Sequence, residues 1–265
     1  MEIFAVKTPI IKPGDDLVDI LITSMEKAGK SFQSRDIIVV AETVLATIQD
    51  RIINLDEVKV PSLRARELAT KYSLDPKVVD IIIKESQEIL GGVDHVLLTR
   101  ANGLLLANAG VDASNAGEGN KICLLPENPW DSIQDFRTRL EEKSEISPMG
   151  AILADSRVQP LKVGVIGGAL AVSGFQPVED RRGMQDLFGR SLIITQIAVA
   201  DDLTSAAELL MGEAAEQTPF VVIRNAPVQF VSDDDEIDRT AMIMPENQCL
   251  FMNVFKDYNN SKLGE

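Results

Sequence analysis

The sequence predicts an α+β protein, on the basis of its size and of the order in which strand-like and helix-like segments follow one another. The chain has 265 residues, of which 45% are apolar and 25% charged, an ordinary globular composition that suffices for one large domain or two small ones. Apolar β-branched runs and amphipathic stretches alternate without a regular strand–helix–strand rhythm, which favours α+β over a doubly wound parallel sheet.

The N-terminal part predicts a strand, a helix and a second strand. Residues 2–9 alternate as a strand does, and residues 36–46 begin with an apolar β-branched run that is typical of a buried strand. Between them, a helix is expected from about residue 16 to residue 29. Its apolar residues recur at helical spacing on one face: Leu17, Ile20, Leu21 and Met25.

Two helices and a hairpin follow in the middle of the chain. The helices are expected over residues 62–72 and 76–90; the second begins with proline and ends at a glycine pair. Residues 95–110 contain two apolar runs around Asn102 and Gly103, a strong signal for a tight β-hairpin.

The second half predicts further strands and helices around a glycine-rich segment. Helices are expected over 130–143 and 201–217, strands over 147–156, 163–175 and 191–200, and residues 219–225 close the ordered core. The acidic stretch 232–238 is expected to be a solvated loop, and residues 258–265 a frayed end.

The charge balance and the cysteines limit the class of function. Acidic residues outnumber basic residues by 41 to 26, for a formal net charge of −15, which opposes binding to nucleic acid or to an anionic membrane. Cys123 and Cys249 lie far apart without a CxxC pair, and we expect Cys123 to be a buried thiol. No segment approaches the length of a membrane span. These features predict a soluble, cytoplasmic protein.

Acidic residues beside small residues are the candidate chemical groups. Asp112 lies in a loop rich in Gly, Ala, Ser and Asn, Asp155 ends an apolar strand beside Ser156, and Glu213 follows a glycine that interrupts a helix. Carboxylate and hydroxyl oxygens suit Mg²⁺ or Mn²⁺. Each residue taken alone is better explained as a cap or turn carboxylate than as a ligand. The residues by themselves therefore indicate only an oxygen-ligated metal and phosphate site.

Two other features favour structural roles. The glycine-rich run 165–174 matches neither GxGxxG at a helix start nor the P-loop pattern, so we interpret it as a tightly packed strand. The single histidine, His95, follows Asp94 but has no neighbouring Ser or Cys nucleophile that would complete a triad, so we interpret it as structural.

Several motifs, in order, resemble the coenzyme F420:glutamate ligase family, whose members add γ-linked glutamate to a deazaflavin coenzyme with GTP. The most specific are NAGVDASN at 108–115 and LLMGE at 209–213; others are PIIKPGDDL, DIIVVAETV, LADS, QDLFGR and the ADDLTSAAE that precedes LLMGE. The resemblance runs to about Arg224. It implies an α+β homodimer of two intertwined lobes, with residues 1–225 forming the ligase region and 226–265 an acidic loop and C-terminal extension.

The resemblance also implies roles for particular residues. Two divalent cations, Mg²⁺ or Mn²⁺, and K⁺ as a further ion would accompany GTP. The metal ligands would be Asp112, Asp155, Ser156 and Glu213, and the catalytic candidates Asp155 and Lys162. The GTP-binding residues would be Thr8, Pro9, Ile10, Ile11, Glu42, Thr43, Asn115, Met211, Gly212, Ala214, Ala215, Glu216, Gln217 and Thr218. The partners would be L-glutamate and the coenzyme F420 precursor.

The chain departs from the family pattern at basic positions. Thr47 stands where the family has a phosphate-contacting lysine, and Gln159 and Val163 stand where it has arginines, so that Lys162 is the basic residue that remains there. Three hypotheses therefore stay open. The protein is a working GTP-dependent glutamate ligase, a divergent paralogue that ligates another acid or only binds nucleotide, or a non-catalytic protein that binds a metal or a partner. A basic side chain of Lys12, Arg157 or Lys162 inside the site would favour the first.

Overall fold

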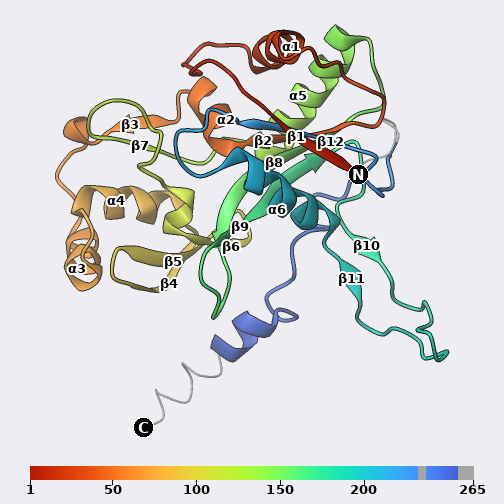
Figure 1. Ribbon diagram of the computed structural model, residues 1–265. Coiled ribbons are helices and arrows are strands. Elements are labelled where there is room, and N and C mark those ends of the chain that lie inside the picture. Colours follow the sequence, from red (N-terminus) through yellow and green to blue (C-terminus); the bar gives the residue numbers. More distant parts are fainter. Residues whose placement is uncertain (232–236, 256–265) are drawn as a thin grey trace.

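A five-stranded sheet forms the centre of the molecule (Figure 1). The structure is a computed structural model that describes residues 1–231 and 237–255. The strands lie in the order β1 (Glu2–Val6), β12 (Phe220–Arg224), β2 (Ile37–Ala41), β8 (Gly150–Val158) and β9 (Val165–Ser173). β2 and β8 run parallel, and the other neighbouring pairs of this sheet are antiparallel. The predicted glycine-rich strand is thus confirmed as β9.

Helices cover both faces of this sheet, as strands with apolar residues on both sides require. One face packs against α1 (Leu17–Lys27) and α5 (Pro129–Ser144), and the other against α6 (Val199–Met211). Successive side chains of β2 point to opposite faces of the sheet and so enter different cores. Ile38 and Val40 face α1 and α5, while Ile37 and Val39 face α6.

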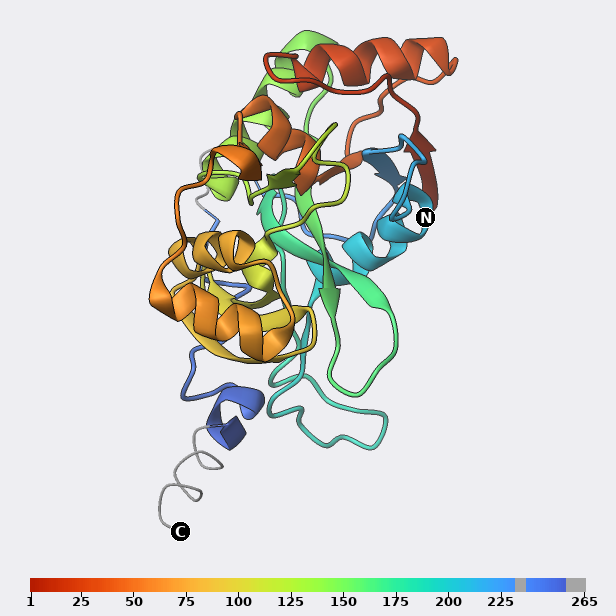
Figure 2. The ribbon, with the colours of Figure 1, turned by 90° about the vertical axis from the view of Figure 1, so that its left-hand side faces the viewer.

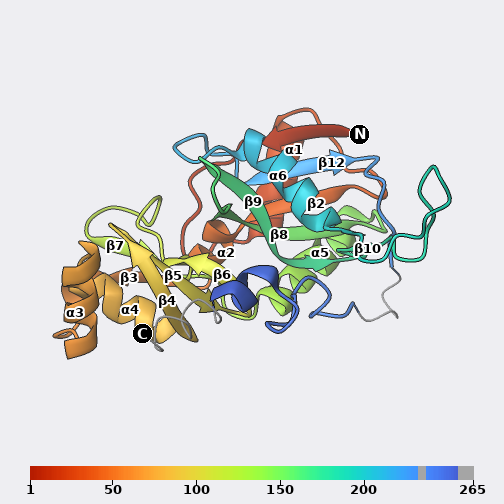
Figure 3. The same ribbon diagram turned by 90° about the horizontal axis from the view of Figure 1, so that it is seen from below.

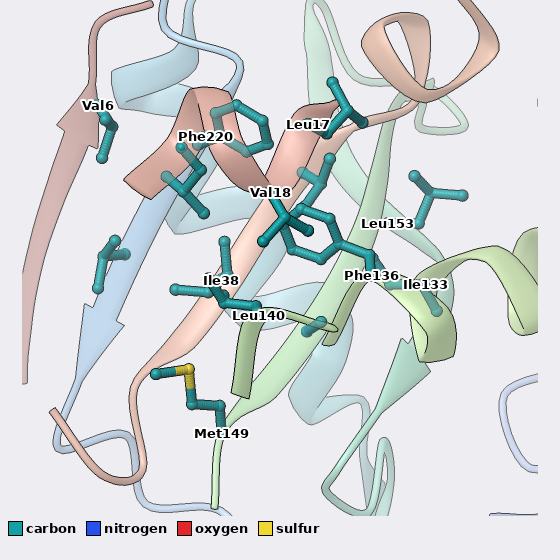
Figure 4. Packing of buried hydrophobic residues seen from close by; sticks show 14 of the residues in the cluster. Val6, Leu17, Val18, Ile38, Ile133, Phe136, Leu140, Met149, Leu153 and Phe220 are labelled. Carbon is teal, nitrogen blue, oxygen red and sulfur yellow. The ribbon is translucent and has the colours of Figure 1, made fainter. Parts of the chain in front are cut away.

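Aromatic and aliphatic side chains from distant parts of the chain fill the first core (Figure 4). The rings of Phe136 on α5 and Phe220 on β12 stack with centroids 6.1 Å apart. Leu21 and Leu153 are fully buried in the same cluster. At roughly 25 cal/mol per Å² of apolar surface, burial of each such leucine contributes about 1.5–3 kcal/mol.

A second, smaller core lies beside the central sheet (Figure 2). It is formed by α3 (Leu63–Tyr72), α4 (Pro76–Glu85) and a three-stranded sheet of β4 (Glu88–Val93), β5 (Val96–Ala101) and β6 (Leu104–Ala107). The predicted hairpin around Asn102 is confirmed as β5–β6. Three further elements connect the two cores: α2 (Glu42–Ile48), β3 (Ile52–Asn54) and β7 (Lys121–Cys123). Seen from below, β6 approaches β8 (Figure 3).

Two hairpins project from the body of the molecule (Figures 1 and 2). One joins β8 to β9, and the other carries β10 (Glu179–Asp180) and β11 (Gln196–Ile197) at its base. Both expose large apolar side chains at or near their tips: Leu161 and Val163 on the first, and Leu187, Phe188, Ile193 and Ile194 on the second.

Four sequence-based boundaries were wrong. The strand expected over 36–46 ends at Ala41, and α2 follows because Leu45 and Ala46 turn one helical face into the interior. The helix expected to reach residue 90 ends at Glu85, since residues 88–93 pair with β5 as β4.

Of the strand expected over 191–200, only β11 forms, because α6 already begins at Val199. The helix over 201–217 ends at Met211, where Gly212 adopts φ 73°, a left-handed value that favours glycine.

The segment after β12 returns along the body of the molecule. Phe230 packs on Phe175, Arg239 pairs with Asp131 on α5 at 2.5 Å, and Glu246 pairs with Arg100 on β5. Residues 232–236 of the predicted acidic loop and the predicted frayed end at 258–265 lie outside the described residues. In the described part of the chain, no helix combines the length and apolarity that crossing a membrane requires.

Candidate active site

A cavity of about 900 Å³ opens at the carboxyl ends of the parallel strands β2 and β8. Its walls come from the segment after β1, the start of α2, β6 with the loop that follows it, and the C-terminal end of α6 with the loop that leads to β12. This volume lies in the range of sites for nucleotide-sized ligands.

Every sequence-predicted site residue except Lys162 lines this cavity. The lining therefore contains Thr8, Pro9, Ile10, Ile11, Glu42, Thr43, Asp112, Asn115, Asp155, Ser156, Met211, Gly212, Glu213, Ala214, Ala215, Glu216, Gln217 and Thr218. Lys162 is exposed in the turn between β8 and β9, where its backbone N–H donates to the carbonyl oxygen of Gln159.

Hydrogen bonds tie the loops of the predicted nucleotide region to one another. The backbone N–H of Thr8 donates to the carbonyl of Gln217 at 2.9 Å, which joins the segment after β1 to the segment before β12. The Asn115 amide donates to the carbonyl of Ala214 at 3.2 Å. Thr218 Oγ1 donates to the carbonyl of Met211 at 2.7 Å. These bonds hold three parts of the sequence around one space: the segment after β1, the loop that contains Asn115, and residues 211–218.

Carboxylates from four segments repel one another across the cavity. Burial, and then the charges of Glu42, Asp112 and Glu213, raise the pKa of Asp155 well above its ordinary value. Burial also raises the pKa of Glu42, assisted by the charge of Asp112 and opposed by a 2.6 Å hydrogen bond from Thr43 Oγ1. In the ionised state these groups favour a cation between them.

One further carboxylate, Glu208, lines the cavity and was missed by sequence reasoning. Burial, the charge of Glu213 and a side-chain hydrogen bond with Glu213 raise its pKa to about 7, and no donor group from the described part of the chain reaches its buried Oε2 atom. Helical spacing was the available signal: Thr204, Glu208 and Met211 recur at four and three residues, and all three line the cavity.

Cys123 lies behind this acidic group. The thiol is buried, as predicted, and burial together with the charges of Glu42 and Asp112 raises its pKa to about 12. It is therefore protonated at neutral pH and is not a nucleophile.

The donor set of the cavity fits hard divalent cations. Within residues 1–231 and 237–255, no three Asp, Glu, His or Cys side chains already lie close enough to form a complete metal cluster. The oxygens nevertheless have the chemistry that Mg²⁺ and Mn²⁺ prefer. A bound cation would relieve the mutual repulsion of Asp155, Asp112 and Glu213 and the repulsion between Glu208 and Glu213.

Among the described residues that line the cavity, Arg157 is the one basic residue. Its Nη2 atom lies 3.1 Å from Asp201 Oδ2, and its Nε atom is buried with no hydrogen-bond partner among residues 1–231 and 237–255. Lys12 and Lys162 are absent from the lining. Of the three basic residues singled out in the sequence, the structure thus brings Arg157 to the site.

Comparison with known proteins identifies the family. The chain matches the family model described as F420-0:Gamma-glutamyl ligase over residues 5–225. It is 38% identical over 220 residues to the coenzyme F420:L-glutamate ligase of Methanothermobacter thermautotrophicus. The aligned region covers 83% of this chain and 86% of that protein. For the coenzyme F420:L-glutamate ligase of Methanocaldococcus jannaschii, the identity is 37% over 255 residues, with 96% and 97% coverage. For that of Archaeoglobus fulgidus, it is 34% over 251 residues, with 94% and 98% coverage. The resemblance inferred from the sequence motifs is confirmed, and the chain belongs to the F420-0:gamma-glutamyl ligase family.

Proposed function

We propose that this protein is a GTP- and divalent-metal-dependent ligase that adds γ-linked L-glutamate to a precursor of the deazaflavin coenzyme F420. The observation that carries the proposal is the single cavity in which Asp112, Asp155 and Glu213 lie beside the loops of the predicted nucleotide region. The family supplies the substrates, and the cavity supplies residues suited to the chemistry.

The reaction must activate a carboxylate that is itself unreactive. In the proposed first step, an oxygen of the precursor's carboxylate attacks the γ-phosphorus of GTP. The bond between this phosphorus and the oxygen of the β-phosphate breaks. GDP departs, and the carboxylate has become an acyl phosphate. In the second step, the amine of L-glutamate attacks the acyl carbon, inorganic phosphate leaves, and the amine loses a proton. Bound Mg²⁺ or Mn²⁺ would neutralise the γ-phosphate and orient it for in-line transfer.

The chain's own residues would divide this work. Asp112, Asp155, Ser156 and Glu213 would hold two divalent ions, with K⁺ as a further ion. The loops 8–11 and 211–218, together with Glu42, Thr43 and Asn115, would hold the guanine nucleotide. Their mutual hydrogen bonds, such as that from Thr8 to Gln217, keep these loops in place before the nucleotide arrives, so that less ordering is needed on binding.

The proposed enzyme is a homodimer in which each chain contributes two lobes. The exposed hairpins support this assembly, because Leu187 and Phe188 are 99% and 86% exposed and Leu161 is fully exposed at the neighbouring hairpin tip. Apolar groups gathered at exposed tips are typical of surfaces that are covered by a partner.

The scarcity of positive charge favours one alternative function. Thr47 lines the cavity where the family carries a lysine, and loss of a charge-assisted phosphate contact costs about 1.5–3 kcal/mol, or roughly tenfold to 150-fold in affinity. The alternative is a divergent paralogue that keeps the metal and nucleotide site but ligates a different acid, or only binds nucleotide.

An isotope-transfer experiment tests the proposed chemistry. The precursor, labelled with ¹⁸O in its carboxylate, is incubated with the protein, L-glutamate, manganese and GTP, and the released phosphate is analysed by mass spectrometry. We expect one labelled oxygen in the inorganic phosphate for each amide formed. Amide formation with unlabelled phosphate would exclude the acyl phosphate, and release of labelled phosphate with ATP but not GTP would exclude the proposed nucleotide.

A further inference from the structure

The carboxylates of the cavity come from two parts of the molecule. The small lobe, formed by α3, α4 and β4–β6 around the second core, leads from β6 to Asp112. The body, formed by the five-stranded sheet and its helices, supplies Asp155 from β8 and Glu213 from the loop after α6. The separation between Asp112 and the other two carboxylates therefore depends on how the small lobe is held against the body.

Asp112 is fixed to the second core by hydrogen bonds. The buried Thr99 hydroxyl on β5 accepts a bond of 2.8 Å from the backbone N–H of Ala109, in the turn that follows β6. The backbone of Asp112 pairs with that of Cys123 on β7 through bonds of 3.0 and 2.7 Å, and β7 buries Ile122 in the second core. A displacement of the small lobe would thus displace Asp112 with it.

A segment that follows β12 crosses from the body to the small lobe. We name this segment, residues 237–246, the strap; in Figure 3 it lies in the blue part of the chain that runs past α5 toward β6. On the body, Ile237 and Met242 pack against the core between the sheet and α6. Arg239 pairs with Asp131 at the start of α5 at 2.5 Å. The body thus holds the strap through apolar and charged contacts.

The strap contacts the small lobe at the β5–β6 hairpin. Ile243 lies against the hairpin turn, so that a methyl group placed on Gly103 would be 3.2 Å from Ile243 Cδ1. Glu246 pairs with Arg100 on β5. The same arginine also pairs, through Nη2 at 3.4 Å, with Glu88 on β4 inside the small lobe. Arg100 therefore has one acidic partner on the strap and one in its own lobe.

Hydrogen bonds within the segment make the strap stiff. The backbone N–H of Ile243 donates to the carbonyl of Thr240 at 2.8 Å, and the N–H of Thr240 donates to Asp238 Oδ1 at 2.8 Å. The N–H of Gln248 donates to the carbonyl of Pro245 at 2.8 Å. Consecutive turns restrict the backbone, whereas a flexible linker leaves its ends free to move. The strap is therefore suited to fix a distance between the two parts it contacts.

From these contacts we propose that the strap positions Asp112 for cation binding. Arg100 and Glu246 are its positioning residues, because their ion pair holds the β5–β6 hairpin against the strap. The proposal rests on the proposed metal site, in which Asp112 shares divalent cations with carboxylates of the body. Mg²⁺ requires oxygen ligands at about 2.1 Å in near-ideal geometry, so that a small shift of the lobe weakens the cation's binding.

A manganese titration followed by electron paramagnetic resonance, without nucleotide or turnover, tests this role. The double variant Ile243→Ala, Glu246→Gln removes both strap contacts with the small lobe, and we expect its Kd for Mn²⁺ to rise roughly twofold to thirtyfold. Glu246→Gln alone should give a smaller rise. The matched control is Glu88→Gln, which removes the other acidic partner of Arg100 and should leave the Kd unchanged.

Hydrogen exchange in the metal-free protein separates positioning from general stability. Release of the strap should speed the exchange of backbone amides in residues 104–112, which lead from the hairpin to Asp112. The amides of α1, on the body, should exchange as in the wild-type protein. Equal acceleration in both segments would indicate a general loss of stability, and it would overturn the proposal. Circular dichroism shows whether each variant is folded.

The remaining outcomes separate the strap from the ligase function. An unchanged Kd for Mn²⁺ in the folded double variant overturns the proposal, and so does an equal rise in Glu88→Gln. If the wild-type protein binds no Mn²⁺, the proposed metal dependence fails and the strap as a positioner of metal ligands fails with it. If Mn²⁺ binding depends on the strap as expected but no product forms, the strap stands and the proposed ligation does not.

Discussion

Substitution of Glu208 by glutamine should stabilise the metal-free protein above neutral pH. The raised pKa of Glu208 means that the folded protein binds its proton more tightly than the unfolded chain does. The free energy of unfolding therefore falls as the pH rises from 4.5, the ordinary pKa of a glutamate, to about 7, the pKa of Glu208 in the folded protein. Above that pH the loss of stability is complete. Glutamine is neutral at every pH, so the variant lacks this penalty.

The size of the effect follows from the same pKa. An interval from 4.5 to about 7 corresponds to about 3.4 kcal/mol at 1.36 kcal/mol per unit of pKa. Because the side chain is only partly buried, solvent screening reduces this figure, and we expect about 1–2 kcal/mol at pH 8. For a chain of this size, that gain raises Tm by roughly 2–8 °C.

Thermal unfolding in a chelator between pH 5 and pH 8.5 measures this effect. The Tm difference between Glu208→Gln and wild type should be close to zero at the acidic end and should grow with pH. Manganese should reduce it at pH 8, because a cation offsets the repulsion in the wild-type protein. The control is Glu142→Gln, an exposed glutamate on α5, which should show no such trend. A variant less stable than wild type at pH 8, or a difference independent of pH, would refute the reasoning.

Three other perturbations address the metal, the nucleotide and the assembly. Asp155→Asn should abolish manganese-dependent GTP binding in isothermal titration calorimetry, and unchanged binding would remove Asp155 from the site. Thr47→Lys should tighten GTP binding by roughly tenfold to 150-fold by restoring the cation of the family pattern; an unaltered Kd would contradict a phosphate contact at this position. The double substitution Leu187→Asp and Phe188→Asp should convert a dimer into a folded monomer in light scattering, and a monomeric wild-type protein would disprove the proposed dimer.

Sequence patterns correctly predicted those helices and strands whose structure depends on neighbouring residues in the chain. The β5–β6 hairpin followed from Asn102 and Gly103, and β9 from its glycine-rich apolar run, because turn geometry and strand alternation are local properties. The position of α2 was not predicted, since the β-branched residues around Leu45 resemble a strand and only tertiary packing selects the helix. β4 was missed for a related reason: pairing with β5 overrides the helical pattern that precedes it.

The candidate site was predictable to the extent that its residues lie in motifs. Asp112, Asp155 and Glu213 each stand in a recognisable loop or strand end, and the fold brings all three to one cavity. Glu208 and the packing of Arg157 on Gly168 depend on how α6 and β8 meet β9, which no single segment encodes. Lys162 remained basic in the sequence but lies outside the cavity, because it falls in a projecting turn.

The most direct test of the central proposal is a ligation assay with the purified protein. The unglutamylated coenzyme, L-glutamate, manganese and GTP are incubated with wild type or with Asp155→Asn, and the products are analysed by mass spectrometry for added glutamyl units. The proposal predicts a mass gain that requires GTP and manganese and that disappears in the variant. No mass gain from a wild-type protein that is still stabilised by nucleotide and metal would contradict it and would leave a paralogue that acts on another acid.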